Sequence, residues 1–284
     1  MRFGSLNGRA VILSDAGTTD IGHRSNELFS SSLDELVPIL DRVEEWYWAN
    51  RPDPTDPRTL EDLQANVHDL SAPLIRSRQI FAIGLNYQSH ADESKLAVPS
   101  APMVFTKFAS AISGPGDDVR LPEGKVDWEV ELVAVIGRGG REIARADALK
   151  HVAAYCVGQD ISERKSQLAL TPPQFSLAKS HQGFAPIGPW LTPASQIPDP
   201  MDLAITCKID EDIVQLDRTK AMMFDISYLI EYLSSVCELF PGDLIFTGTP
   251  EGVGMGRNPQ RYLRSGEQLI SSIEGLGELR NLCV

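Results

Sequence analysis

Short apolar runs separated by glycine and proline recur along most of this chain. Runs of four to eight residues that are rich in β-branched side chains predict strands rather than helices. One longer segment, 225–240, has helical spacing instead. This pattern predicts a β-dominated α+β fold with mixed sheets rather than a regular alternation of strands and helices. The expected strands are 80–84, 103–105, 128–136, 152–157, 204–209, 244–247 and 268–273.

The start of the chain shows two different local signals. Asn7-Gly8 stands between two short apolar runs, which is the strongest short signature of a β-hairpin. Further on, Ser32 and Glu35 have the spacing of a capping box, and apolar residues follow with helical spacing to about Ala49. We therefore expect a hairpin followed by one helix.

A proline-rich stretch, 51–57, follows the predicted helix. Proline cannot continue a helix or an inner strand, so this stretch predicts a loop. The length of 284 residues suits one large domain with an appendage, or two domains. We expect a small N-terminal domain at 1–76 and a catalytic domain at 77–284.

Composition and charge restrict the partners. A formal charge of −13 and a pI near 4.8 argue against nucleic acid and against an anionic membrane surface. No apolar run approaches the roughly 20 residues of a membrane span, and the first residues lack the apolar stretch of a signal peptide. A cytoplasmic location is the resulting expectation. The scattered cysteines are expected as reduced, buried thiols: Cys156, Cys207, Cys237 and Cys283.

Two glutamates interrupt the apolar run 128–136. Glu129 and Glu131 are two positions apart, so in a strand their side chains point to the same face. Two like charges close together in a protein interior repel, and such a pair must share a proton, reach bulk water or hold a cation. A divalent cation is the most economical solution. The alternative is an exposed edge strand whose glutamate face is solvated.

A third carboxylate is available from Asp160, which follows the apolar run 152–157. Three carboxylates form an all-oxygen site that suits Mg²⁺ or Mn²⁺. Zinc is disfavoured because no pair of histidines or cysteines in the sequence has ligand spacing. Three protein ligands leave coordination positions open for water or substrate.

A candidate base follows the first strand of the predicted catalytic domain. His90 and Glu93 share one face if this segment is helical. A histidine paired with a carboxylate can deprotonate a water molecule near neutral pH. The alternative for His90 is an ordinary surface position on a loop.

Polar residues after the third carboxylate are candidates for substrate contacts. Arg164 and Gln167 lie about one helical turn beyond Asp160 and could contact an anionic substrate, although a solvated helix start would give the same pattern. Lys179 stands in an otherwise apolar run, where an unpaired ammonium group is unfavourable. We expect a carboxylate or a substrate to compensate its charge.

A glycine-rich turn, 247–254, follows a predicted strand. Glycines let a backbone approach a ligand closely, and Thr249 adds a hydroxyl group. A plain structural turn explains the pattern equally well. The turn lacks the lysine of a phosphate-binding loop, which counts against a nucleotide site.

The ordered set of these motifs resembles the fumarylacetoacetate hydrolase family. Each motif is weak alone, but their order along the chain is specific, and the resemblance covers residues 80 to 284. The motifs are Gly84-x-Asn86-Tyr87-x-x-His90-x-x-Glu93, Asp127-x-Glu129-x-Glu131, Asp160-x-Ser162-x-Arg164-x-x-Gln167, Lys179-Ser180, Phe184-Ala185-Pro186-Ile187-Gly188-Pro189 and Thr247-Gly248-Thr249-Pro250-x-Gly252-Val253-Gly254.

The resemblance implies a β-roll of mixed sheets, usually a homodimer, that binds Mg²⁺ or Mn²⁺. It further implies metal binding by Glu129, Glu131 and Asp160, activation of water by His90 with Glu93, and substrate contacts. Those contacts are expected from Lys179, Thr249, Arg164, Gln167 and Tyr87. One departure is the segment 180–184, where many relatives have an Asp-Thr pair before the phenylalanine. This departure leaves the choice of substrate undecided.

A site of this kind would hydrolyse a 2,4-dioxo acid (an acylpyruvate) to pyruvate and a carboxylic acid, with the small anionic oxo acid bound through its carboxylate and 2-oxo group. The same enolate can form by decarboxylation of oxaloacetate or by isomerisation of a 2-hydroxydienoate. His90 and Glu93 favour hydrolysis, because activating water is what this pair supplies. An alternative of another class is a catalytically silent, metal-stabilised interaction protein.

Overall fold

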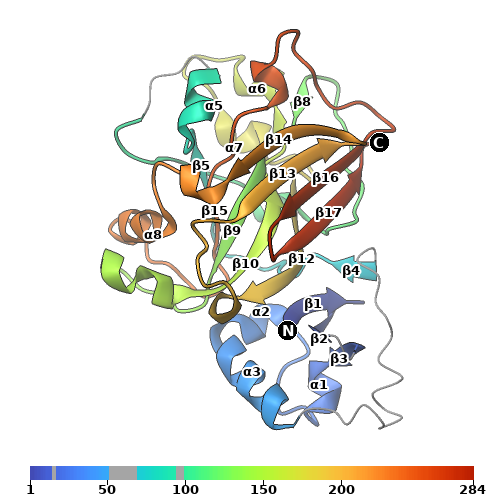
Figure 1. Cartoon of the computed structure of the whole chain (residues 1–284), viewed down its shortest axis with the longest axis vertical. Coiled ribbons are helices and arrows are strands. Elements are labelled where there is room, and N and C mark those ends of the chain that lie inside the picture. The colour runs from blue at the N-terminus through green and yellow to red at the C-terminus, as the bar shows by residue number, and fades with distance from the viewer. Residues whose placement is uncertain (15–16, 51–68, 94–98) are drawn as a thin grey trace.

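The computed structural model describes residues 1–14, 17–50, 69–93 and 99–284. Strands make up most of the regular structure, and the helices are short (Figure 1). The β-dominated α+β fold with mixed sheets is confirmed. The expected loop at 51–57 lies outside the described residues.

The strands are β1 (Arg2–Leu6), β2 (Arg9–Ser14), β3 (Gly17–Asp20), β4 (Leu70–Ser71), β5 (Ile80–Gly84), β6 (Met103–Thr106), β7 (Ile112–Ser113), β8 (Val126–Asp127), β9 (Val130–Ile136), β10 (Val152–Gln159), β11 (Ser162–Glu163), β12 (Ala185–Pro193), β13 (Ala204–Ile209), β14 (Asp212–Arg218), β15 (Leu244–Phe246), β16 (Gln268–Ile273) and β17 (Gly277–Leu282). The α-helices are α1 (Ile21–Arg24), α2 (Leu33–Leu36), α3 (Leu40–Ala49), α5 (Gln88–Glu93), α6 (Arg164–Gln167), α7 (Phe175–Ala178) and α8 (Ile226–Ser234). Short 3₁₀ helices are η1 (Val37–Ile39), η3 (Ala109–Ala111), η4 (Arg145–His151), η5 (Ala194–Gln196), η6 (Thr219–Ala221) and η7 (Gly254–Gly256).

One large sheet runs through the molecule in the order β3-β2-β1-β12-β10-β9-β15-β5-β6. Neighbours in this order are antiparallel except for β15 and β5, which are parallel. Outside this order, β4 pairs with β1 in antiparallel and β7 pairs with β12 in parallel. A second, antiparallel sheet has the order β14-β13-β16-β17 and packs over β9, β10 and β12 (Figure 1). The centre of the molecule is therefore the pair of strands β9 and β10, which carries residues of the predicted site.

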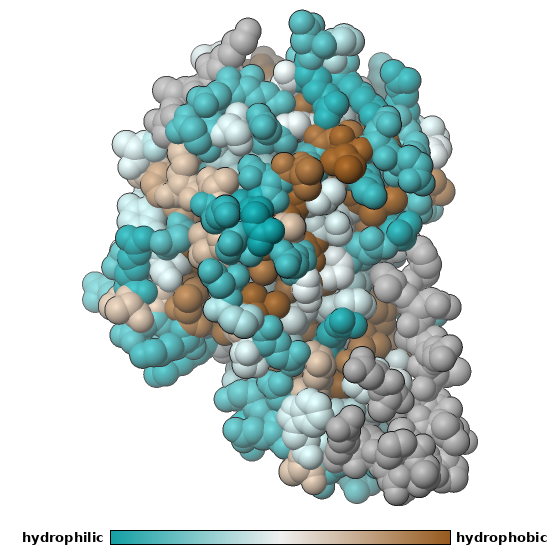
Figure 2. Space-filling view, in the orientation of Figure 1, coloured by the Kyte–Doolittle hydropathy of each residue, from teal (hydrophilic) through white to brown (hydrophobic). Residues whose placement is uncertain are grey.

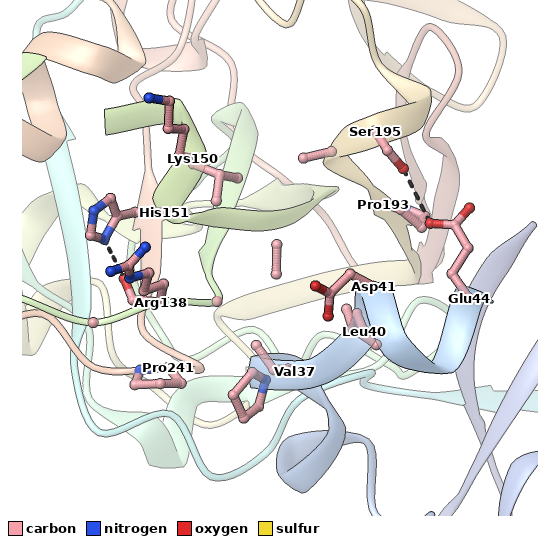
Figure 3. Close-up of a pocket in the computed structure, with 16 residues that line it drawn as sticks. Val37, Leu40, Asp41, Glu44, Arg138, Lys150, His151, Pro193, Ser195 and Pro241 are labelled. Atoms are coloured by element: carbon pink, nitrogen blue, oxygen red, sulfur yellow. Dashed lines mark hydrogen bonds between the residues drawn. The ribbon is translucent and has the colours of Figure 1, made fainter. Parts of the chain in front are cut away.

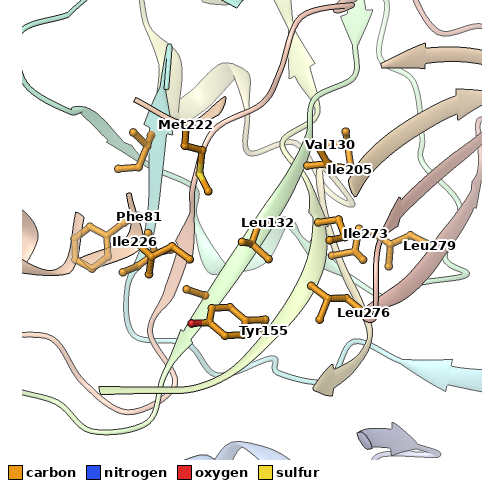
Figure 4. Packing of buried hydrophobic residues seen from close by; sticks show 14 of the residues in the cluster. Phe81, Val130, Leu132, Tyr155, Ile205, Met222, Ile226, Ile273, Leu276 and Leu279 are labelled. Atoms are coloured by element: carbon orange, nitrogen blue, oxygen red, sulfur yellow. The ribbon is translucent and has the colours of Figure 1, made fainter. Parts of the chain in front are cut away.

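β9 belongs to two apolar layers at once. Its side chains alternate, so that Leu132 and Ala134 pack in the larger core cluster and Val133 and Val135 in the other. Figure 4 shows the first layer, in which Leu132 lies between the side chains of the second sheet and those near α8. A strand that is buried on both faces holds its backbone rigidly, and polar groups at its ends are held in place with it.

The strands predicted from apolar runs are all present, with bounds that differ by a few residues. Three strands of six or more residues were missed, β12, β14 and β17, as were the shorter strands β3, β4, β7, β8 and β11. β12 contains three prolines, which normally argue against an inner strand. β14 and β17 carry many polar residues because one side of their sheet is exposed. The helix expected at 225–240 ends earlier, at Ser234.

At the N-terminus the hairpin is confirmed, and Asn7 and Gly8 adopt positive φ angles in its turn. The expected single helix is divided into α2, η1 and α3, since Pro38 cannot donate a backbone hydrogen bond. The capping box was wrong, because the Ser32 side chain caps no backbone group. Glu35 instead accepts a hydrogen bond from the Ser30 hydroxyl at 2.7 Å.

The N-terminal hairpin continues the large sheet, since β1 pairs with β12 where Phe3 lies opposite Leu191. The domain boundary near Arg76 stays a prediction. Apolar side chains reach the surface on β14, where Ile213 and Leu216 are exposed (Figure 2). Within the described residues, no helix is both long and apolar enough to span a membrane.

Candidate active site

The three predicted carboxylates converge where β9 and β10 meet. Glu129 precedes β9, Glu131 lies on it, and Asp160 follows β10. One carboxylate oxygen from each lies within 4.8 Å of the others, and all three residues are buried. The antiparallel pairing explains this, because the Asp160 N–H donates to the Glu129 carbonyl at 2.9 Å.

The strand that carries the glutamates starts later than expected. Residues 128 and 129 lie between β8 and β9, so the predicted continuous strand 128–136 was wrong at its start. Side-chain amides replace the missing strand partners there. The Glu129 N–H donates to the Gln159 side-chain oxygen at 2.8 Å, and the Val130 N–H donates to that of Gln215 at 3.1 Å. These buried glutamines hold the backbone that aims Glu129, and the sequence reasoning missed them.

Buried cations surround the carboxylates. Lys179 Nζ donates to Glu129 at 2.8 Å and to Asp160 at 2.6 Å. Arg164 donates to Glu129 at 2.6 Å and to Asp127 at 2.8 Å. The expected compensation of Lys179 by a carboxylate is therefore present. Arg164 was predicted to contact substrate. Three of its nitrogen atoms donate hydrogen bonds to protein groups, and the third of these groups is the Gln167 side chain at 3.0 Å.

A second lysine, Lys107, was missed by the sequence reasoning. Its ammonium group is fully buried, donates to Asp160 at 2.5 Å and also donates to the Lys179 carbonyl. Lys107 comes directly after the apolar strand β6, just as Lys179 follows an apolar run. The rule that identified Lys179, an ammonium group at the end of an apolar run, would also have found Lys107.

The electrostatic environment shifts the pKa values of the two glutamates, Glu129 and Glu131, in opposite directions. Burial works to raise the pKa of Glu129, but the charges of Lys179 and Arg164 outweigh burial and hold this pKa below its ordinary value. Burial and the nearby Asp160 and Glu129 raise the pKa of Glu131 well above its ordinary value. The described contacts of Glu131 include one backbone donor, Gly248 N–H at 2.7 Å, and no cation. Glu131 is the carboxylate whose ionisation a bound cation would favour most.

The predicted base lies beside this cluster. His90 and Glu93 are on α5, and His90 lines the same cavity as Glu129, Arg164 and Lys179. His90 Nδ1 is buried without a hydrogen-bond partner and lies 3.6 Å from a Glu93 carboxylate oxygen. This distance exceeds a hydrogen bond, but a small side-chain movement would close it.

The glycine-rich turn orders the acidic side chains through its backbone. Gly248 N–H donates to Glu131, and Gly252 N–H donates to both oxygens of Glu93 at 3.1 Å. Gly254 N–H donates to Asp127 at 2.7 Å. A side chain at Gly252 would meet the Val214 carbonyl at 2.0 Å, so only glycine fits there. The turn therefore supports the site directly.

The remaining substrate candidates are placed differently. Thr249 lines the cavity, but its hydroxyl donates to the Val130 carbonyl at 2.8 Å and accepts from Gln215 at 2.8 Å. Gln167 lines the cavity. Its side-chain oxygen accepts a hydrogen bond from Arg164, and its amide nitrogen takes no part in that bond. Tyr87 does not line the cavity, and its ring packs in the core with a hydroxyl that has no hydrogen-bond partner.

Two cavities in the part of the chain that the structure describes are candidates for the active site. The larger, about 650 Å³, lies between α3 and the segment before β10, and it is lined by Asp41, Glu44, Arg138 and His151 among others (Figure 3). The smaller, about 60 Å³, contains His90 and the edge of the acidic cluster. The smaller cavity is the candidate active site, because buried charges and the unpartnered histidine are there.

Residues 79–284 match the model of the fumarylacetoacetate hydrolase C-terminal domain, and the chain belongs to this family.

Particular relatives extend this similarity. The mitochondrial oxaloacetate tautomerase FAHD2A of Bos taurus is 40% identical over 215 residues, which are 75% of this chain and 68% of that protein. A crystal structure from Mycobacterium smegmatis, provisionally assigned as HpcE, has a TM-score of 0.91 and 46% identity and covers 100% of this chain and 99% of that one. The maleylpyruvate hydrolase of Sphingobium sp. SYK-6, in complex with manganese and pyruvate, has a TM-score of 0.81 and 26% identity, with 100% and 99% coverage.

Proposed function

We propose that this protein is a Mg²⁺- or Mn²⁺-dependent hydrolase that cleaves a C–C bond in a 2,4-dioxo acid and releases pyruvate and a carboxylic acid. One observation carries the proposal. Three buried carboxylates cluster beside a cavity that one of them, Glu129, lines together with His90, a histidine without a hydrogen-bond partner at Nδ1. Such a site combines a place for a cation with a base that can activate water.

The donor set fits a hard divalent cation. Glu129, Glu131 and Asp160 offer only oxygen ligands, within 4.8 Å of one another. Burial and the charges of Asp160 and Glu129 raise the pKa of Glu131, and a bound cation would offset the repulsion among these carboxylates. When bound, the cation would polarise the carboxylate and 2-oxo group of the substrate as a Lewis acid. The manganese and pyruvate of the Sphingobium relative support this choice.

Different residues of this chain then have different roles in the reaction. His90, steadied by Glu93, takes a proton from water, and the resulting hydroxide attacks the 4-oxo carbon. The bond between carbons 3 and 4 breaks, and its electrons form the enolate of pyruvate. Lys179 stays protonated, because burial lowers its pKa less than Asp160 and Glu129 raise it. Its charge stabilises the enolate, which takes up at carbon 3 the proton that His90 removed from water.

A second candidate is proton-shift chemistry on the same enolate, without cleavage. The oxaloacetate tautomerase relative, at 40% identity, favours it. Such a reaction needs no attacking water, so it would depend less on the pair of His90 and Glu93. Decarboxylation of oxaloacetate and isomerisation of a 2-hydroxydienoate belong to the same group of outcomes.

Pyruvate release tests the proposal. The Mg²⁺-loaded protein is incubated with acylpyruvates and with oxaloacetate, next to an EDTA-treated sample and a His90→Ala variant. Metal- and His90-dependent pyruvate from an acylpyruvate supports the hydrolase. Pyruvate from oxaloacetate alone indicates a decarboxylase. Absence of pyruvate, with a changing keto-enol absorbance, indicates the proton shift, and no reaction of any oxo acid indicates a silent protein.

We also propose a homodimer in a cytoplasmic setting. The exposed Ile213 and Leu216 on β14 offer an apolar face for a second copy. Light scattering coupled to size exclusion measures the oligomeric state. A Leu216→Asp variant that becomes monomeric would support this face, and an unchanged dimer would place the interface elsewhere.

A further inference from the structure

We infer that the acyl group accepted by this site is uncharged and apolar, so that the substrate carries a single carboxylate. This inference rests on the proposed function and narrows its substrate class. The charges and the lining of the smaller cavity carry it.

Apolar side chains form a wall of the cavity that Glu129 of the acidic cluster also lines. They come from the residue after β5, from β6 and from the segment that runs from the end of α6 to the start of α7, and they include Leu85, Met103, Phe105, Leu168 and Phe175. The rings of Phe105 and Phe175 lie 5.6 Å apart, and the Lys179 ammonium group lies 4.9 Å from the centre of the Phe105 ring. A substrate bound at the carboxylates therefore extends its acyl group along an aromatic and aliphatic surface.

The cations that line the cavity are already committed. Lys179 donates to Glu129 and Asp160, and Arg164 donates to Asp127 and Glu129. No other lysine or arginine is among the described residues that line this cavity. Among the described lining residues, a second carboxylate at the far end of a substrate meets no cation that is not already paired with protein carboxylates, and burying an unpaired charge is unfavourable.

The balance of buried charge leads to the same conclusion. Lys107, Lys179 and Arg164 supply three positive charges, and a divalent cation would bring the total to five. The buried carboxylates of the cluster supply four negative charges: Asp127, Glu129, Glu131 and Asp160. One positive charge remains, which one substrate carboxylate neutralises. A dicarboxylate would leave an excess negative charge among buried groups.

Two substrates with the same carbon chain separate the possibilities. Butanoylpyruvate ends in a methyl group where succinylpyruvate ends in a carboxylate. We expect kcat/KM of the Mg²⁺-loaded enzyme to be about 100-fold higher for butanoylpyruvate, because an uncompensated like charge in a binding site costs several kcal/mol. Equal or better use of succinylpyruvate would overturn the inference and leave the proposed hydrolase intact.

Binding provides a readout that does not depend on turnover. Calorimetry compares 2-oxohexanoate with 2-oxoadipate, which share one carbon chain and differ by the terminal carboxylate. We expect the monocarboxylate to bind more tightly by a similar factor. Equal affinities would contradict the inference, whereas binding of neither acid, together with no turnover of any acylpyruvate, would contradict the proposed function itself.

A charge added to the wall should weaken the preference for the monocarboxylate. Leu168 lines the cavity and is 53% exposed, so Leu168→Lys places an ammonium group beside the acyl group without disturbing the core. Leu170 is 60% exposed and does not line the cavity, and Leu170→Lys is the matched control. We expect Leu168→Lys to raise kcat/KM for succinylpyruvate about tenfold and Leu170→Lys to leave it unchanged. An equal response of both variants would argue against the apolar wall as the determinant.

Discussion

The N-terminal region and the active site bury very different side chains. In the described residues 1–14 and 17–50 no charged side chain is buried, and the interior under the hairpin and α3 is built from residues such as Leu36 and Val43. Around the ends of β9 and β10, by contrast, three buried cations form ion pairs with three buried carboxylates, Asp127, Glu129 and Asp160. Apolar burial stabilises the first region by itself, whereas the second is stable only while each charge keeps its partner.

The largest expected effect comes from removing a proposed metal ligand. Glu131→Gln should reduce turnover by at least about 1,000-fold, since the affinity for the cation and the polarisation of the substrate depend on this carboxylate. The metal-free protein should keep its melting temperature, because burial and Asp160 already favour the neutral form of Glu131. Turnover and thermal unfolding in EDTA are measured together, with the partly exposed Glu278→Gln as control. Retained turnover would contradict the assignment of the ligand.

Removing a buried cation should reduce stability instead. Lys107→Met leaves Asp160 without the partner at 2.5 Å, and breaking a buried ion pair on one side costs about 3–5 kcal/mol. Lys150→Met is the control, since Lys150 pairs with Asp147 on the surface with 74% of its side chain exposed. Urea unfolding of both variants measures the difference. Equal, small losses would mean that Lys107 is not a required counter-charge.

In the N-terminal region, Leu36→Ala should lower the free energy of unfolding by about 2–5 kcal/mol through the cavity it leaves. Leu36 lies on α2, and no described contact joins a side chain of α2 to the acidic cluster. The folded fraction of the variant should therefore keep its metal affinity. Urea unfolding and titration with Mn²⁺ measure both quantities. Loss of metal affinity in the folded protein would show that the two regions are coupled.

The smallest effect concerns the exposed ion pair of the N-terminal region. Burial works to raise the pKa of Asp20, but the hydrogen bonds from Arg9 and from the His23 N–H lower it below its ordinary value. The stabilisation is therefore present above the unfolded pKa of about 3.9 and is lost as the pH falls through the lower folded pKa. Arg9→Gln should cost at most about 1 kcal/mol at neutral pH. Unfolding at pH 6 and at pH 2.5 should show a difference at the higher pH only; equal differences would exclude the ion pair as its cause.

Local signals predicted much of the fold. Apolar runs located the inner strands, and Asn7-Gly8 located the hairpin, because each of these signals is contained in neighbouring residues. The proline-containing β12 was missed, since its pairing with β1 and β10 overrides the local preference of proline. The proposed ligands were identified because carboxylates in an apolar run are unusual. Gln159 and Gln215 were missed because a buried polar residue is recognised by its partner, which lies far along the chain. Lys107 was missed although it follows an apolar run, the local signal that identified Lys179.

By itself the sequence determined the β-dominated class, the family and the acidic residues at the ends of the inner strands, since these depend on periodicity and on residue type. The tertiary structure alone decided which charges neutralise which. It paired Lys107 with Asp160 and Arg164 with Asp127 and Glu129, and it left Glu131 with a single backbone donor. Electrostatic interactions depend on distance and burial, and both are properties of the packed chain rather than of residue order.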